Sequence, residues 1–456
     1  MTATTPRPSR VRRRPKRPPV RPEALRAAAE FPALDAIFTR RARRFALGAE
    51  ITGPLAYRSE AEPVPLAYEE EAILVAAATG RTGVVREEWP FTTADGTTSG
   101  ADKLASYTGR SYPSPVAIHG TELFWTNDDG VFVLPLRDVK PTAYVENQTV
   151  DEQHALYRSA LRLQKGRLEI PRRRPNLFRF NEWIVNTEGS TVFIPISDVT
   201  RQCINAMLLY FDRPHGYYIV DKQLRRDPLE PFVRSGLLDP THPVDLADFE
   251  RWQLVDMNGV EPGLVVQNLM IATQALGLGG HPFSGGKGRV TMLGDPEWQG
   301  IGGSGPCGSL GFELHRVPDG APVGAGELLP VGLPGVFEGC CPPFHGSMDA
   351  AVDHVVDLRW GDRGIFSAPD RQQIPWLSPD IARAVPPPSE EAIEATKTLC
   401  RYIWDTYGRF PATIDPFVTT VWYQACHLDI AFYDRYYPRE AVPDQVRAHM
   451  HDWHGM

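Results

Sequence analysis

The most apolar segment of the chain runs from Val260 to Phe283, VEPGLVVQNLMIATQALGLGGHPF. Few polar side chains interrupt it, so a helix built on it would be apolar on nearly every side and would belong inside a fold. Glycines follow at 277, 279 and 280, and glycine can adopt the positive φ that closes a helix and can leave the backbone open to a ligand. We predict a buried central helix that ends near Gly277, after which His281 and Pro282 turn the chain away. A core helix with a glycine stop and no ligand is the simpler alternative.

Other hydrophobic patterns predict both helices and strands. Residues 66–79 carry acidic residues first, an apolar stripe later and a stop at Gly80, which is typical of a helix. Strand-forming residues at 122–126, an Asn-Asp-Asp-Gly turn and a second apolar run at 131–134 indicate a β-hairpin. A further strand at 191–195 precedes a helix that Ser197 and Asp198 can cap. Because these elements lack a repeated βαβ order, we predict an α+β fold in which helices pack an antiparallel or mixed sheet.

The C-terminal part reads as an extension of this domain. The run Pro386-Pro387-Pro388 indicates a boundary, and Ser389 can cap a helix that ends at Tyr407. Asp415-Pro416 suits the start of a second helix to about Tyr436. We therefore predict four regions, which are a disordered basic arm at 1–21, the main domain with insertions at 22–330, an irregular connecting region at 331–388 and a helical hairpin at 389–456.

Charge separates the N-terminal arm from the rest. The net charge is −8, but residues 1–30 hold nine Arg or Lys against Glu23 and Glu30, so the remainder carries about −15. An acidic body argues against specific nucleic-acid binding. The arm mixes arginines with prolines, so removing residues 1–21 is expected to cost little packing. No run approaches the ~18 apolar residues of a membrane helix, and we expect a soluble cytoplasmic protein with no membrane partner.

Histidine and cysteine patterns give weak signals. The six cysteines form no CxxC pair and read as packed thiols in a reducing compartment. Gly303 to Gly308 is a formal GxGxxG without the strand and helix that a nucleotide site needs. We interpret His427 as a packed, hydrogen-bonded histidine, and His449, His451 and His454 as part of a chain end that frays. We predict no metal site.

Three separated segments together resemble the nitroreductase superfamily of FMN-dependent oxidoreductases, in particular its azoline-oxidase-like branch. The first is Arg40-Arg41-Ala42-Arg43-Arg44-Phe45, followed by the helix that ends at Gly80. The second is GRSYPSPVAIHGTELFW at 109–125, which is similar to the family's Pro-Ser turn entering a strand. The third is the end of the central helix at 267–280. The order and spacing agree over roughly residues 35–290, and the chain resembles large uncharacterised members.

The resemblance implies a nitroreductase-like fold and FMN as the cofactor. It implies hydride transfer between NAD(P)H or an organic substrate and an acceptor, and a homodimer that holds FMN at the shared interface. The catalytic residues and the small-molecule substrate stay open, as does the choice between reductase and oxidase. The cofactor residues carried over are Arg40, Arg41, Arg43, Pro113, Ser114, Gly279 and Gly280.

Two alternatives remain beside this hypothesis. The arginine run is also the pattern of a solvated charged surface, although guanidinium groups bind phosphate in a bidentate way. The family usually has Ser where Arg41 stands, and small residues with Gly where this chain has Pro115-Val116-Ala117. The alternative function is therefore a flavin-free, nitroreductase-like binding or scaffold protein.

Overall fold

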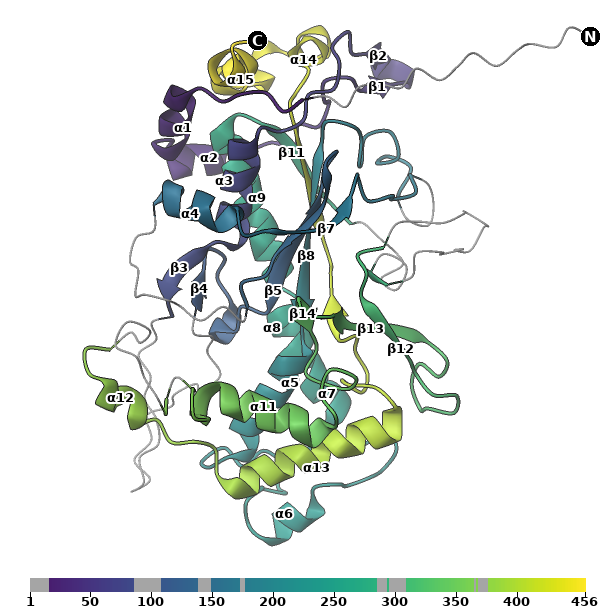
Figure 1. Cartoon of the computed structure of the whole chain (residues 1–456). Coiled ribbons are helices and arrows are strands. Elements are labelled where there is room, and N and C mark those ends of the chain that lie inside the picture. The colour runs from purple at the N-terminus through teal and green to yellow at the C-terminus, as the bar shows by residue number, and fades with distance from the viewer. Residues whose placement is uncertain are drawn as a thin grey trace, which may run out of the picture.

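The computed structural model describes residues 16–85, 108–137, 149–172, 177–284, 293–294, 309–364, 366–367 and 376–456. A seven-stranded antiparallel sheet forms the centre of the molecule (Figure 1). Its order is β11-β16-β8-β5-β6-β7, and the short β15 also pairs with β8. The strands are β5 Thr121–Thr126, β6 Gly130–Leu134, β7 Leu161–Lys165, β8 Thr191–Asp198, β11 Gly279–Phe283, β15 Phe417–Val418 and β16 Trp422–Cys426.

Both faces of the sheet are covered, because successive side chains of a strand point to opposite faces. In β5, Leu123 and Trp125 pack in one core with helices α3 (Tyr68–Thr79) and α9 (Glu261–Leu276), whereas Phe124 packs in a second core on the other face. The predicted hairpin is confirmed, since β5 and β6 pair around the turn at 127–130. The α+β prediction with an antiparallel sheet and a central helix is confirmed as well.

The central helix α9 ends at Gly277, as predicted from the sequence. Gly277 follows Leu276 with a φ of 77°, and its N–H is shared between the carbonyl oxygens of Gln274 and Thr273. The helix is not buried on every side, because Val260 just before it is 43% exposed and Gln267 is exposed. The expected turn at His281 and Pro282 is wrong. These residues lie in β11, which pairs with β16 along its whole length.

A second, helical core lies beyond one end of the sheet (Figure 1). Helices α5 (Thr200–Phe211), α11 (Met348–Trp360) and α13 (Glu390–Tyr407) pack there through buried side chains that include Val352 and Leu399. Residues 331–388 therefore contain a regular helix in a shared core and are not only an irregular connection. The five cysteines of the described residues are buried and free, as predicted for packed thiols.

The predicted second helix of a C-terminal hairpin is wrong in its first half. The segment Trp422–Cys426 is strand β16, which lies between β8 and β11 in the central sheet. Its side chains are all buried, and two are large aromatic residues that suit a strand covered on both faces. Burial in the sheet outweighs the local helix-start signal of Asp415-Pro416. The C-terminal part thus completes the main domain.

The basic arm is also shorter than predicted. Residues 1–15 lie outside the described residues, but residues 16–21 lie against the domain. The Arg17 guanidinium donates to Asp129 at 2.9 Å and to Glu71 at 3.3 Å, and the Arg21 N–H donates to the carbonyl oxygen of Trp453 at 2.9 Å. Removing residues 1–21 would therefore break these contacts, contrary to the expectation from composition. Arg17 lies against the domain because it forms ion pairs with the carboxylates of Glu71 and Asp129.

The remaining elements are smaller. They are helices α1 Pro22–Ala29, α2 Ala33–Thr39, α4 Val150–Tyr157, α6 Glu230–Arg234, α7 Leu246–Glu250, α8 Asp256–Asn258, α12 Pro379–Arg383, α14 Ile430–Tyr436 and α15 Asp444–His454, and strands β1 Glu50–Ile51, β2 Tyr57–Arg58, β3 Arg81–Val84, β4 Thr108–Arg110, β9 Ile219–Val220, β10 Val244–Asp245, β12 Glu313–Arg316, β13 Leu328–Leu333 and β14 Phe337–Glu338. In the described part of the chain, no helix is long and apolar enough to cross a membrane. The GxGxxG segment at 303–308 lies outside the described residues.

Candidate functional site

Two of the three sequence segments meet at the C-terminal end of α9. The backbone of Arg43 pairs with that of Gly280 in an isolated antiparallel bridge, so the arginine segment lies along the start of β11. The Arg43 side chain is 6% exposed. Its Nε donates to the carbonyl oxygen of Ala441 at 2.9 Å, and its Nη1 donates to the Gln274 Oε1 of α9 at 3.2 Å. Arg43 thus joins three separate parts of the chain.

The guanidinium groups of this segment have no acidic partner in the described part of the chain. Among the described residues, no Asp or Glu forms an ion pair with Arg40, Arg41, Arg43 or Arg44. Arg41 is exposed and donates only to the backbone carbonyls of Phe38 and Arg40. Burial lowers the pKa values of Arg43 and Arg44, and Arg41 adds repulsion at Arg43. Clustered arginines without carboxylates make this part of the molecule an attractive place for an anion.

A cavity of about 270 Å³ opens beside this segment. Its lining combines the arginines with an aromatic wall and a few aliphatic side chains, and consists of Arg41, Ala42, Arg43, Arg44, Phe45, Ile51, Leu55, Trp183, Phe432, Tyr433, Tyr437 and Ala441. The Arg44 guanidinium lies 5.3 Å from the centre of the Trp183 ring, and the N–H groups of Arg44 and Phe45 both donate to the Tyr433 hydroxyl. The cavity can hold a ligand with an anionic group and a flat apolar part.

The space beside Gly279 and Gly280 is filled by protein atoms. A Cβ at Gly279 would lie 2.2 Å from Cδ2 of Leu428, and one at Gly280 would lie 2.2 Å from the Tyr423 hydroxyl oxygen. Both residues are buried within β11. In this chain, the glycines let side chains of β16 and the segment after it pack against the strand backbone.

The Pro113-Ser114 turn lies at the opposite end of α9. The Ser114 hydroxyl donates to Oε1 of Glu261 at 2.5 Å, and Glu261 is the first residue of the helix. A helix of 16 residues is about 24 Å long. One chain therefore does not bring Ser114 and the arginine segment to the same cavity. Pro113 is exposed.

His281 is a residue whose position the sequence did not reveal. It lies in β11 next to Gly280, is 4% exposed, and neither ring nitrogen has a hydrogen-bond partner among the described residues. Burial lowers its pKa to about 4, and the nearby Arg44 charge contributes in the same direction. The imidazole is therefore neutral at pH 7. The sequence, in which His281 and Pro282 were expected to form a turn, gave no signal that the imidazole would lie within the electrostatic reach of Arg44.

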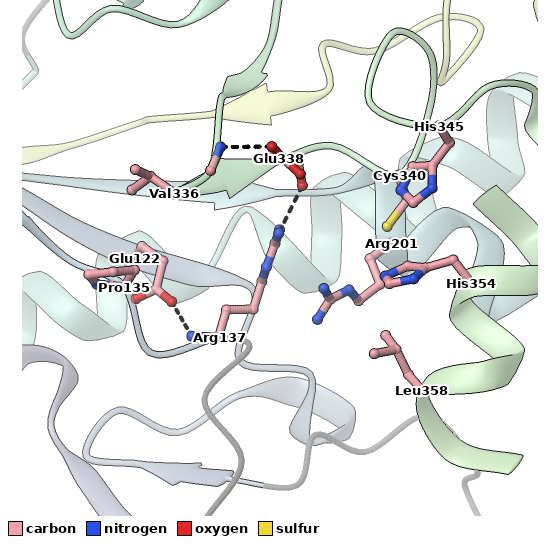
Figure 2. A pocket seen from close by; sticks show the side chains of 11 residues that line it. Glu122, Pro135, Arg137, Arg201, Val336, Glu338, Cys340, His345, His354 and Leu358 are labelled. Atoms are coloured by element: carbon pink, nitrogen blue, oxygen red, sulfur yellow. Dashed lines mark hydrogen bonds between the residues drawn. The ribbon is translucent and has the colours of Figure 1, made fainter. Parts of the chain in front are cut away.

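A second cavity, of about 430 Å³, lies near the end of β8 at Asp198, with which Arg137 of its lining pairs (Figure 2). Arg137, Arg201, His345 and His354 line it together with Cys340 and Glu338. The Arg137 Nη2 donates to the Glu338 carbonyl oxygen at 2.8 Å, and its guanidinium also pairs with Asp198. The two histidine rings lie 4.9 Å apart between their centres. The sequence reasoning missed this group because its members come from four separate segments.

Burial sets the protonation states in the second cavity. It raises the pKa of the Cys340 thiol and lowers the pKa of His345. At neutral pH the thiol is therefore protonated, and His345 is a neutral imidazole. A protonated thiol is a poor nucleophile. The arrangement suits the binding of a ligand with an anionic group near the two arginines better than covalent catalysis, although Arg137 already pairs with Asp198, and Glu122 and Glu338 share the lining.

Comparisons with known proteins find few relatives. No family model matches the sequence, and no curated protein matches it. Among solved structures, the chain is similar to one from Ralstonia eutropha described as a "putative nitroreductase", with 13% sequence identity and a TM-score of 0.24. The alignment covers 56% of this chain and 70% of that one.

Proposed function

We propose that this protein is an FMN-dependent oxidoreductase of the nitroreductase type, with the flavin phosphate at the arginine segment 40–44. The observation that carries the proposal is the 270 Å³ cavity in which three arginines, with no acidic partner among the residues that the structure describes, face an aromatic wall. The phosphate of FMN is a dianion, which guanidinium groups bind by charge-assisted hydrogen bonds. Two of the three segments that resemble the family adjoin this cavity, because Arg43 pairs with Gly280.

The cavity fits part of the cofactor. Its volume of about 270 Å³ is below the roughly 300–1,000 Å³ of complete small-molecule sites. Arg41 and Arg44 would hold the phosphate, and Trp183 and Tyr437 would flank the apolar part of the cofactor and exclude water. When bound, FMN supplies a ring that accepts and gives up hydride, so the protein needs no nucleophile of its own. The reductant would be NAD(P)H or an organic substrate.

A homodimer would complete the site. Ser114 and the arginines lie at opposite ends of α9, so two copies packed in antiparallel orientation along this helix would bring one copy's Ser114 close to the other copy's arginines. The outward side of this region is apolar. In α2, which packs against α9, Leu34, Ile37 and Phe38 are 63%, 42% and 71% exposed. Such a patch is typical of a protein interface.

Absorption spectroscopy tests the cofactor. We expect a flavin band in the purified protein, or after incubation with FMN and removal of the excess. Replacing Arg44 by Ala should weaken FMN binding about ten- to a hundredfold, the equivalent of one charge-assisted contact of roughly 1.5–3 kcal/mol. Arg234→Ala is the matched control, because Arg234 is exposed on α6 at the other end of the molecule. A wild-type protein that shows no flavin band under either condition would exclude the enzyme hypothesis.

Anaerobic mixing with NADH or NADPH then identifies the reductant. Bleaching of the flavin by either nucleotide supports a reductase. A flavin that neither nucleotide bleaches points to an oxidase that takes hydride from an organic substrate.

One observation favours the alternative, a flavin-free binding protein. The second cavity, with Arg137 and Arg201, offers an anion site that needs no flavin. Failure of FMN to bind, together with binding of a small organic anion that Arg201→Ala abolishes, would establish that function instead. Isothermal titration of wild type and variant with such anions provides the measurement.

A further inference from the structure

Four chemically suitable side chains converge in the interior, well apart in the sequence. Glu70 lies in the first turn of α3, His427 follows β16 directly, and His449 and His454 lie on α15. One ligand atom from each lies within 4.8 Å of the others. The side chains of Glu70, His427 and His454 are fully buried, and that of His449 is 3% exposed. The expectation that the C-terminal histidines belong to a frayed end is therefore wrong for His449 and His454.

Each imidazole is oriented by a backbone carbonyl. The Nδ1 atoms of His427, His449 and His454 lie 2.8–2.9 Å from the carbonyl oxygens of Val64, Leu276 and Pro19. A carbonyl oxygen can only accept, so each Nδ1 must carry the proton and donate it. In the neutral ring, the lone pair is then on Nε2. In metal-binding histidines, such a hydrogen bond from one ring nitrogen to a carbonyl oxygen fixes the tautomer and leaves the other nitrogen free to bind the metal.

The three Nε2 atoms all face the Glu70 carboxylate. Nε2 of His449 and of His454 lie 2.9 Å and 3.1 Å from Oε1, and Nε2 of His427 lies 3.2 Å from both carboxylate oxygens. The contact of His449 does not have the geometry of a hydrogen bond. The carboxylate also accepts the Ala67 N–H at 2.6 Å. Glu70 is therefore held in place from two sides.

The Glu70 carboxylate and the three Nε2 atoms converge on one small volume, because one ligand atom from each residue lies within 4.8 Å of the others. With neutral rings, three lone pairs point at an anion with no donor between them. The centres of the three rings lie 5.1–5.4 Å apart, so their Nε2 atoms surround the carboxylate from separate directions. Burial makes unpaired charge and unsatisfied polar groups costly. One divalent cation accepts all four lone pairs and leaves a single net positive charge.

We propose that Glu70, His427, His449 and His454 bind a divalent first-row transition metal ion, with zinc as the best match. Zinc prefers four ligands from imidazole and carboxylate at about 2.0–2.2 Å, which places tetrahedral ligand atoms roughly 3.4 Å apart. The contacts with Glu70 already have this scale, so binding requires the histidine ligand atoms, which lie within 4.8 Å of one another, to move closer together. Because protein fills all four positions and the side chains are buried, the site is structural and has no open position for a substrate.

The metal ion would fasten the C-terminal helix to the sheet. Its ligands join α3, the end of β16 and α15, and their carbonyl partners extend the connection to Pro19 and to Leu276 at the end of α9. Gln445 of α15 also donates to the Ala275 carbonyl of α9. The ion would thereby hold the end of α9 that adjoins the arginine segment. The site stands independently of the proposed flavin function.

Metal analysis of the full chain, prepared without a histidine tag, tests the site. We expect about one transition-metal ion per chain after purification, or after incubation with zinc and gel filtration. Removing the ion with a chelator should lower Tm, and adding zinc at about a hundredfold excess over Kd should raise it again by about 3 °C or more, whereas magnesium should not. A chain that binds no transition metal and whose Tm is insensitive to chelator and zinc overturns the proposal.

Two substitutions separate the site from adventitious binding. His449→Ala removes one ligand, and His451→Ala is the matched control, because His451 lies on the same helix with a 75% exposed side chain. The first should retain less than about a tenth of the wild-type metal content, and the second should retain all of it. Equal metal content in the two variants would identify a surface site and refute the assignment.

A spectroscopic probe covers the case in which His449→Ala does not fold. Cobalt(II) added to the metal-free wild type should give the intense visible absorption of a four-coordinate site. Glu70→Gln keeps the shape of the side chain but removes its charge, so it should weaken cobalt binding. A weak, octahedral-type spectrum in the wild type would contradict the proposed ligand set.

Discussion

At the scale of single residues, burial and hydrogen bonding determine what each arginine can do more than the residue type does. The arginines at 40–44 look alike in the sequence, but Arg43 is buried and bonded to Ala441 and Gln274, whereas Arg41 is exposed. Removing Arg43 would break two hydrogen bonds and leave a void, so its loss tests folding as much as cofactor binding. Arg44 is the better probe of the cavity because it is only half-buried, although its Nη1 also donates to Asn181 and to the Phe180 carbonyl oxygen.

His281 gives a residue-scale prediction of acid sensitivity. Its pKa is lowered to about 4 by burial and by Arg44, while the unfolded chain keeps a value near 6.5. Between these values the unfolded state binds the extra proton, so stability is unaffected above pH 6.5 and falls as the pH drops toward 4. Between pH 7 and pH 5, the free energy of unfolding should fall by about 2 kcal/mol more in the wild type than in the His281→Phe variant.

Urea unfolding of both proteins at the two pH values measures this difference. His281 has no hydrogen-bond partner in the described residues, so the Phe variant should be at least as stable as wild type at pH 7. An acid-induced loss of equal size in wild type and variant would show that His281 is not kept neutral in the fold.

At the scale of elements, close packing explains the glycines better than ligand access does. The backbone of β11 lies against Tyr423 and Leu428, and there is no room for a side chain at Gly279 or Gly280. Sequence patterns do not distinguish a glycine that admits a ligand from one that admits a neighbouring side chain, because both require the absence of Cβ. Only the pairing of β11 with β16 settles the cause here.

Gly280→Ala should destabilise the protein by about 1–3 kcal/mol, because the new methyl group would overlap the buried Tyr423 hydroxyl and approach the Gln424 carbonyl oxygen. Gly263→Ala is the control with the opposite expected sign. Gly263 is exposed within α9 and has open space beside it, so alanine should stabilise the helix by about 0.5–1 kcal/mol. Thermal melts of both variants check the pair. A neutral Gly280→Ala would show that β11 has space for a ligand.

At the scale of the whole molecule, the apolar side of α2, which packs against α9, stays exposed in the single chain, because Leu34, Ile37 and Phe38 are 63%, 42% and 71% exposed. A second copy of the chain would bury it. Such a dimer would also explain why the predicted cofactor residues lie at the two opposite ends of α9.

Phe38→Glu should convert a dimer to a monomer, because a carboxylate would be forced into an apolar interface. The expected weakening of the dimer is at least about a hundredfold, or about 2.7 kcal/mol. Leu377→Glu serves as the control, since Leu377 is 87% exposed and lies next to α12, remote from α2. Light scattering coupled to gel filtration gives the molecular mass. A wild-type chain that is monomeric at micromolar concentration while holding FMN would contradict the shared site.

The sequence by itself determined the elements whose signals are local. Gly277 ends α9, and the turn at Asn127 to Gly130 forms the predicted hairpin, because backbone dihedral preferences act within a few residues. The tertiary structure alone decided β16, which was predicted as helix, because its burial between β8 and β11 outweighs a capping signal. It alone brought Glu70 to His454, 384 residues away, and the arginine segment to Gly280. Such contacts depend on which surfaces bury one another, and no local pattern encodes that.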